Sequence, residues 1–207
     1  MTEYNLVYLL DGKVYINLTN SCTNNCVFCI RAIKDDVVGT NLFLNTENVK
    51  AEDVISQLEA IKDKLSSEII FCGYGEPMLK LEVLKEVAKY IKDNYPNTII
   101  RVNTNGHANK VYKRNVLPEL KGFVDKFSVS LNGENEEVYS MVSVPSFEGA
   151  YEAVKEFIKE AVNEGFDTTA TIVTGYKNYK IDMPKCIEIT KELGAKFRER
   201  PWIENGY

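Results

Sequence analysis

The stretch YINLTNSCTNNCVFCIRA, residues 15–32, places Cys22, Cys26 and Cys29 within eight residues, directly after an apolar run typical of a strand. The whole chain has five cysteines, an odd number, and its 207 residues are enough to form a core without disulfides. Three crowded cysteines in such a chain indicate a metal site or reactive thiols rather than a disulfide framework. These three side chains are therefore the first candidates for a functional site.

Composition and charge exclude several classes of protein. The chain is 44% hydrophobic and 27% charged, with a net charge of -5, as is typical of a globular domain. It has no cluster of Lys and Arg side chains, which nucleic-acid binding normally requires, so we expect no nucleic-acid partner. No run of 18 apolar residues suggests a membrane span. The opening segment MTEYNLVYLLDG lacks the basic region and long apolar stretch of a signal peptide, so we expect a cytoplasmic protein.

The rest of the chain alternates between strand-like and helix-like segments. Two apolar runs flank Asp11-Gly12, a dipeptide that favours a two-residue hairpin turn. Amphipathic patterns predict helices at residues 51–65, 81–96, 109–120, 147–165 and 183–194. Apolar runs predict strands at residues 14–19, 68–72, 98–103, 125–131, 167–174 and 195–202.

This alternation favours an α/β fold in which parallel strands are joined by right-handed crossovers. Six strand–helix units are too few for a closed eight-unit barrel. The sequence therefore predicts a partial (β/α)6 TIM-type barrel or an open doubly wound sheet, with a β-hairpin at the N-terminus. No linker composition interrupts the pattern, so residues 1–207 are expected to form a single domain.

In both architectures, chemistry gathers at the carboxyl ends of the parallel strands. The polar and glycine-rich segments of this sequence lie at those positions. After the cysteines, these segments are CGYGEP (72–77), NTNG (103–106), SLNG (130–133) and VTG (173–175). The predicted functional site therefore combines these segments with the three cysteines.

The spacing of the three cysteines bears on which metal they would bind. Structural zinc usually takes four ligands in two separated pairs, and this chain has no second pair. A fourth ligand would have to be Cys72, Cys186 or His107, and none of them is spaced like a ligand partner. Iron–sulfur clusters are held by Cys thiolates. A [4Fe-4S] cluster held by three thiolates would leave one iron open for a small molecule.

The segment CTNNCVFC resembles the CxxxCxφC signature of the radical S-adenosyl-L-methionine (SAM) enzymes, with Phe28 at the aromatic position. The segment GYGEP resembles the Gly-Glu-Pro motif that follows the second strand in that family. The resemblance extends from about residue 14 to about residue 200. It implies a partial (β/α)6 barrel and a [4Fe-4S] cluster ligated by Cys22, Cys26 and Cys29, with SAM on the open iron. The short form FCGYGEP and the chain length also resemble the small TatD-associated radical SAM subgroup.

The resemblance further implies a set of SAM contacts, each weighed against an ordinary role in a turn or in the core. Glu76 would accept a hydrogen bond from the amino group of SAM, because an acceptor suits a cation, and its neighbouring glycines would permit close backbone approach. The other contacts would be polar groups at strand ends and apolar groups near the adenine. The implied cofactor-binding residues are Phe28, Gly73, Gly75, Glu76, Asn103, Ser130, Asn132 and Val173.

The activity implied by the family is reductive cleavage of SAM to a 5'-deoxyadenosyl radical that abstracts hydrogen from a substrate. The sequence assigns no catalytic residue and does not identify the substrate. A peptide or partner protein is expected, with a small molecule as the alternative. A flavodoxin- or ferredoxin-like electron donor and a functional link to a TatD-type hydrolase are also implied. The polar stretch at residues 31–50 is a candidate lid.

Two other classes remain open on the residues alone. One is a non-catalytic iron–sulfur or zinc-binding protein on an α/β scaffold, which would have a fourth protein ligand and would not bind SAM. The other is an α/β enzyme with a redox-active thiol site, which would have a cysteine of lowered pKa and would need no iron.

Overall fold

The computed structural model describes residues 5–37 and 39–203. The chain folds into two compact units, as far as their residues are described. The first unit holds residues 1–22, 34–103 and 119–126, and the second holds residues 23–33, 104–118 and 127–207.

The first unit begins with the expected hairpin. Strands β1 (Val7–Leu10) and β2 (Lys13–Ile16) pair antiparallel around Asp11 and Gly12, whose φ angles of 48° and 71° are those of a type I′ turn. Strands β5 (Glu68–Phe71) and β6 (Ile99–Thr104) then continue the sheet, each parallel to the strand before it. The strand order in this unit is β1-β2-β5-β6.

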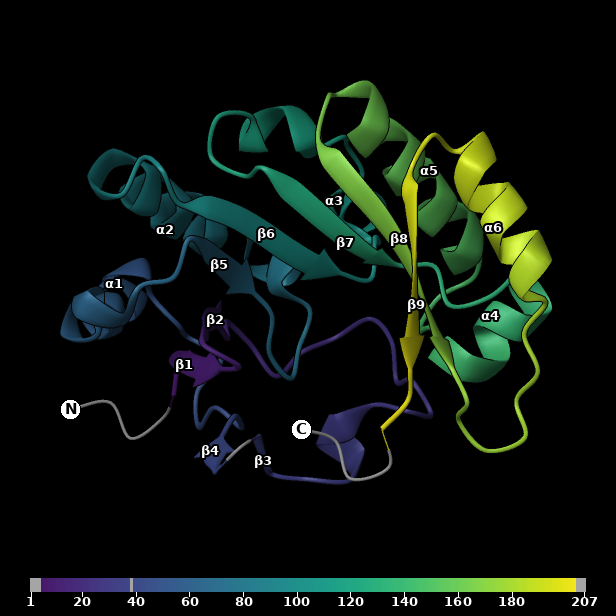
Figure 1. Ribbon diagram of the computed structural model, residues 1–207, viewed down its shortest axis with the longest axis horizontal. Coiled ribbons are helices and arrows are strands. Elements are labelled where there is room, and N and C mark those ends of the chain that lie inside the picture. The colour runs from purple at the N-terminus through teal and green to yellow at the C-terminus, as the bar shows by residue number, and fades with distance from the viewer. Residues whose placement is uncertain (1–4, 38, 204–207) are drawn as a thin grey trace. The chain divides into compact units, whose positions relative to one another are not determined.

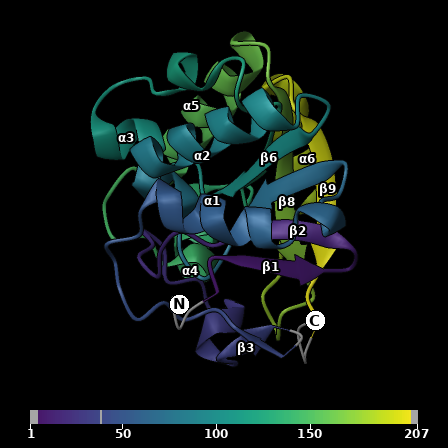
Figure 2. The same cartoon turned by 90° about the vertical axis from the view of Figure 1, so that its left-hand side faces the viewer.

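Helices α1 (Ala51–Ala60) and α2 (Leu81–Asn94) lie on the same side of β5 and β6 (Figures 1 and 2). Both are amphipathic and bury one face, as their periodicity predicts. Short 3-10 turns adjoin them, η2 (Lys62–Lys64) after α1 and η3 (Pro77–Lys80) before α2.

The candidate lid, residues 31–50, is partly fixed to the end of β2. It contains a small antiparallel pair, β3 (Asp36–Val37) with β4 (Thr40–Asn41). Beyond this pair, Asn17 Nδ2 donates to the Leu42 carbonyl over 2.7 Å and Asn20 Nδ2 donates to the Leu44 carbonyl over 2.7 Å. Because Leu42 and Leu44 are also buried, this half of the segment is packed rather than free.

The second unit contains β7 (Lys126–Ser130) from its second residue on, then β8 (Asp167–Thr174) and β9 (Lys196–Pro201) in that order, and β8 and β9 are parallel. Helix α5 (Ala150–Asn163) packs against β8 and α6 (Met183–Glu192) against β9 (Figure 1). The six strands predicted after the hairpin turn are thus all present, as β2 and β5 to β9.

Two regions differ from the helices predicted between the strands. The single helix expected at residues 109–120 is two short pieces, α3 (Ala108–Tyr112) and η4 (Leu117–Leu120), because Lys113 takes a left-handed conformation and ends α3. Helix α4 (Glu136–Ser143) was not predicted. The side chain of Asn135 caps its start, and Val144 ends it with a φ of 44°, which is rare for a β-branched residue.

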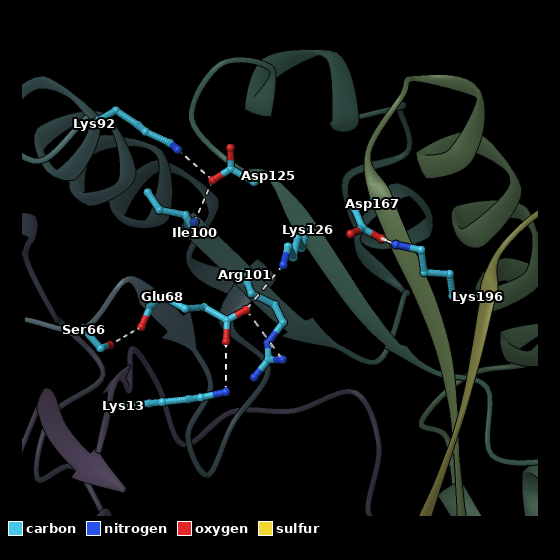
Figure 3. Close-up of polar contacts among 10 residues, drawn as sticks. All are labelled: Lys13, Ser66, Glu68, Lys92, Ile100, Arg101, Asp125, Lys126, Asp167 and Lys196. Atoms are coloured by element: carbon cyan, nitrogen blue, oxygen red, sulfur yellow. Dashed lines mark hydrogen bonds and ion pairs between the residues drawn. The ribbon is translucent and has the colours of Figure 1, made fainter. Parts of the chain in front are cut away.

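Ion pairs lie at the N-terminal ends of the strands (Figure 3). Lys92 Nζ lies 2.7 Å from Asp125 Oδ2, and that same oxygen accepts the backbone N–H of Ile100. Lys196 pairs with Asp167 over 2.7 Å between β9 and β8. The exposed Lys196–Asp167 pair contributes little to stability, and the buried apolar residues of the strands and helices carry the fold. Among the described residues, no helix has the length and hydropathy needed to cross a membrane.

Candidate cluster-binding site

The three cysteines lie between β2 and the 3-10 turn η1 (Ile30–Ala32). Cys22, Cys26 and Cys29 are all partly exposed, and none forms a disulfide. Cys29 closes one turn by donating its N–H to the Cys26 carbonyl over 3.0 Å, and its own carbonyl accepts the N–H of Ala32 over 3.1 Å. The chain around the second and third cysteines is therefore held in tight turns by its own backbone.

Within the second unit, the end of α4 holds the backbone of the cysteine segment. Val27 N–H donates to the Val142 carbonyl over 3.0 Å, and Asn25 N–H reaches the Ser143 carbonyl over 3.1 Å. The Thr23 carbonyl accepts a further backbone N–H, from Ser146, over 2.9 Å, and Asn24 forms a β-bridge with Pro145. The unpredicted helix α4 thus provides a support for the residues between the first two cysteines.

A buried polar network centred on His107 reinforces this support. Its Nδ1 lies 2.8 Å from Thr23 Oγ1, and its Nε2 lies 2.8 Å from the hydroxyl of Tyr139. Asn105 Nδ2 donates to the same Thr23 oxygen over 2.8 Å, and Asn24 Nδ2 donates to the Tyr139 hydroxyl over 3.2 Å. His107 and Tyr139 are both fully buried, so these bonds form away from water, where they are strongest.

His107 is excluded as a metal ligand because both of its ring nitrogens already have partners. Burial lowers its pKa from 6.5 to about 4, only partly offset by a backbone hydrogen bond involving Ala150, so the ring is neutral at physiological pH. Cys186 is also excluded, because it is fully buried in α6 and burial raises the pKa of its thiol to about 12. Neither residue can complete a four-ligand zinc site.

The donor chemistry of the three cysteines fits an iron–sulfur cluster. They are unbridged thiols on one short, partly exposed segment, and thiolates are the ligands that such clusters take. Among the described residues, no three His, Cys, Asp or Glu side chains are arranged to hold a metal ion as they lie here. The assignment of Cys22, Cys26 and Cys29 as ligands therefore rests on donor type and spacing.

The glycines of GYGEP pack against the chain that leads to Cys22. A Cβ on Gly73 would lie 2.0 Å from Asn17 Oδ1, and a Cβ on Gly75 would lie 2.4 Å from the Thr19 carbonyl oxygen. These distances are far below van der Waals contact, so only glycine fits at either position. The sequence predicted a close backbone approach to a ligand, whereas the structure shows a close approach to the chain's own backbone and side chains.

Glu76 is buried, with 4% of its surface exposed, and its N–H donates to the Ser21 carbonyl over 2.8 Å. Its Oε1 accepts the N–H of Met78 over 3.0 Å and so caps the short turn η3. The carboxylate is thus held in a fixed position at the carboxyl end of β5. The backbone of Glu76 is hydrogen-bonded to Ser21, the residue before Cys22.

Two asparagines predicted to contact the cofactor have buried amide oxygens without a hydrogen-bond partner among the described residues. Asn103 lies near the end of β6, and its Oδ1 is buried and unpaired. Asn132 follows β7 with a φ of 56°; its Nδ2 donates to Ser143 Oγ over 3.2 Å, but its Oδ1 is likewise unpaired. An unpaired buried acceptor costs free energy, which a ligand that donates a hydrogen bond would recover. Ser130 and Val173, the other two predicted positions, are partly exposed residues of β7 and β8.

Phe28 belongs to an aromatic cluster that was not predicted from the sequence. Its ring lies edge-on to Tyr176 at 6.2 Å between centroids, and Tyr176 in turn lies edge-on to Trp202 at 4.9 Å. The sequence did contain a signal for this cluster, because Tyr176 follows VTG at the end of β8 and Trp202 follows β9. Within the second unit, the cluster sets aromatic rings beside the residue that precedes Cys29.

Comparison with known proteins identifies a family for this chain. A family model described as the Radical SAM superfamily matches residues 16–188. A relative, 7-carboxy-7-deazaguanine synthase of Methanocaldococcus jannaschii, is 24% identical over 158 residues, which is 73% of this chain. The chain spans 59% of the length of that relative.

Solved structures share the fold at low sequence identity. SuiB of Streptococcus suis bound to its precursor peptide SuiA matches 92% of this chain and 39% of its own, with a TM-score of 0.68 and 14% identity. The enzyme anSMEcpe with bound AdoMet matches 91% of this chain and 50% of its own, with a TM-score of 0.62 and 14% identity. These neighbours have the partial TIM-barrel fold, so the prediction of that fold class is confirmed. Because the family model covers residues 16–188 and the fold is shared over 92% of the chain, the protein belongs to the radical SAM superfamily.

Proposed function

We propose that this protein cleaves SAM reductively and uses the resulting radical to abstract hydrogen from a substrate. The observation that carries the proposal is the trio of unbridged, partly exposed cysteines at positions 22, 26 and 29 in a chain of this superfamily. Enzymes of the superfamily use a [4Fe-4S] cluster and SAM. When bound, the cluster supplies the electron that splits SAM into methionine and a 5'-deoxyadenosyl radical. In the proposal, Cys22, Cys26 and Cys29 hold three irons of that cluster.

The contribution of this chain to the reaction is binding, orientation and exclusion of water. Glu76, buried and capped in place, would accept a hydrogen bond from the amino group of SAM. The unpaired amide oxygens of Asn103 and Asn132 would accept hydroxyl or amino donors of the same molecule. Ser130 would add a hydroxyl at the end of β7. Gly73 and Gly75 keep the Glu76 segment pressed against the chain before Cys22.

The adenine of SAM would lie near Phe28 and Val173. The edge-on contact between Phe28 and Tyr176 fixes the ring that neighbours Cys29, which supports this placement. Stacked or edge-on aromatic groups bind planar heterocycles well because of their complementary charge distribution.

We assign a peptide or partner protein as the substrate class, with a small molecule as the alternative. The support is the structural neighbour SuiB, which was solved with its precursor peptide. The electron would come from a flavodoxin- or ferredoxin-like donor in the cytoplasm. Within the superfamily, the short FCGYGEP motif favours the TatD-associated subgroup and a functional link to a TatD-type hydrolase.

Anaerobic reconstitution with iron and sulfide tests the proposal. We expect the electron paramagnetic resonance spectrum of the reduced cluster to change when SAM is added, and dithionite to drive formation of 5'-deoxyadenosine. The Glu76→Gln variant keeps the oxygen that caps η3 but loses the charge, so it should retain iron and bind SAM more weakly. Tetrahedral zinc, or a cluster with four protein ligands, would refute the proposal. A fully active iron-free protein would instead support a redox-thiol enzyme.

A further inference from the structure

One face of the sheet in the second unit is turned away from helix α5. On β7, the ring of Phe127 lies edge-on to that of Phe157 in α5, at 5.5 Å between centroids, so Phe127 points toward the helix. Because side chains alternate along a strand, Ser128 and Ser130 lie on the opposite face. We call this opposite face of β7, β8 and β9 the serine face.

The last strand, β9, adds two arginines to the serine face. Arg198 Nη2 donates to Ser128 Oγ over 3.0 Å, which places Arg198 on this face. Arg200 is two residues further along β9 and therefore lies on the same face. The parallel register sets Arg200 beside Val173 of β8, a residue proposed to lie near the adenine of SAM.

Arg200 lies at the carboxyl end of its strand, close in the fold to the cysteine segment. Strand β9 ends one residue after Arg200, and Trp202 follows it. The Trp202 ring contacts the ring of Tyr176, and Tyr176 contacts Phe28, the residue before Cys29. The end of β9 is thus joined by aromatic contacts to the segment that is proposed to hold the cluster.

Arg200 is exposed and has no hydrogen bond or ion pair among the described residues. Other charged residues of β9 do have partners: Lys196 pairs with Asp167 over 2.7 Å, and Glu199 accepts a hydrogen bond from Thr174 Oγ1 over 2.7 Å. A cation that only protects an edge strand against aggregation can occupy any exposed position of that strand. Arg200 instead lies at the end of β9 that adjoins the cysteine segment, with its guanidinium available to a ligand.

We propose that Arg200 binds an oxyanion of the substrate, a carboxylate or a phosphate, beside the bound SAM. A guanidinium presents its N–H donors as a planar fork that matches two oxygens of either group. The position beside Val173 suits this role, because a substrate must lie next to SAM to lose hydrogen to the radical. The inference rests on the proposed function and narrows the substrate class to molecules or peptides that carry an anionic group.

Isothermal titration calorimetry of the reconstituted protein with SAM bound tests the inference. Inorganic phosphate and acetate are titrated at constant ionic strength, with chloride as the reference anion. We expect saturable millimolar or tighter binding of at least one oxyanion, and the tighter of the two indicates the natural group. Arg200→Gln should weaken this binding about tenfold or more, and Arg200→Lys, which keeps the charge but loses the fork, should have an intermediate effect.

Arg114 provides the matched control, because it is also an exposed arginine of the second unit. Arg114→Gln should leave the dissociation constant unchanged. A measurement on the wild-type protein needs no variant to fold: phosphate or acetate should slow the labelling of Arg200 by phenylglyoxal, mapped by mass spectrometry, and should not slow that of Arg114.

Three results would overturn the inference. They are no saturable binding to the wild-type protein, equal binding by the Arg200→Gln and Arg114→Gln variants, and a loss of SAM affinity in Arg200→Gln without a loss of anion affinity. The last result would assign Arg200 to the carboxylate of SAM instead. Because SAM binding and 5'-deoxyadenosine formation are measured in the same preparations, failure of the proposed function is recognised separately.

Discussion

Replacing Tyr139 with Phe would remove one buried hydroxyl and keep the ring. That hydroxyl lies 2.8 Å from His107 Nε2 and accepts the Asn24 side-chain amide over 3.2 Å. Both bonds belong to the network that holds the cysteine segment to α4. The substitution therefore tests whether this network fixes the segment before any cofactor binds.

The expected cost follows from the groups that lose a partner. A buried polar group left without its hydrogen bond destabilises a protein by about 1–3 kcal/mol. His107 is fully buried and loses the partner of one ring nitrogen, and Asn24 loses one acceptor. We therefore expect Tyr139→Phe to lower the free energy of unfolding by about 2–4 kcal/mol.

Tyr151 provides a matched control. It is also buried, its ring lies 5.6 Å from that of Tyr139, and its hydroxyl has no hydrogen-bond partner in the described part of the chain. Tyr151→Phe should therefore be neutral or slightly stabilising. Urea unfolding of the cluster-free protein, followed by circular dichroism, measures both variants.

A second readout is the rate at which iodoacetamide alkylates Cys26 and Cys29 under native conditions. We expect this rate to rise in Tyr139→Phe and to stay unchanged in Tyr151→Phe, because only the first variant frees the segment. If the two variants had the same stability and the same alkylation rates, the network would not position the cysteines and the reasoning would be refuted.

Three other perturbations have defined outcomes. Cys26→Ala should abolish iron binding in reconstituted protein, whereas Cys186→Ala should retain full iron content, because the Cys186 thiol is fully buried in α6 and the Cys26 thiol is partly exposed. The folded pKa of His107, about 4, lies below its unfolded value of 6.5, so the unfolded chain binds the proton first as pH falls. Stability should decrease by about 3 kcal/mol between pH 6.5 and 4, and unfolding curves across that range should show a flatter dependence in His107→Gln. Gly75→Ala should destabilise the fold by about 1–3 kcal/mol or prevent folding, as thermal unfolding would show, because its Cβ would meet backbone oxygen at 2.4 Å.

The sequence by itself located most of the elements and predicted the set of metal-binding cysteines. Period-2 and period-3.6 patterns depend on local geometry, so they located six strands and the long helices α2 and α5 correctly. The spacing of Cys22, Cys26 and Cys29 and the GYGEP segment were sufficient for the family, because these motifs are contiguous in the chain.

Only the tertiary structure decided how these motifs are held. Helix α4 has a short apolar pattern that is easily missed, yet its carboxyl end supports the backbone between the first two cysteines. From the sequence, His107 is expected only to follow a turn. In the structure its two ring nitrogens contact Thr23 and Tyr139, which lie 84 and 32 residues from it in the chain. Local sequence patterns do not reveal such distant partners, because burial and hydrogen bonding are fixed only when the segments pack.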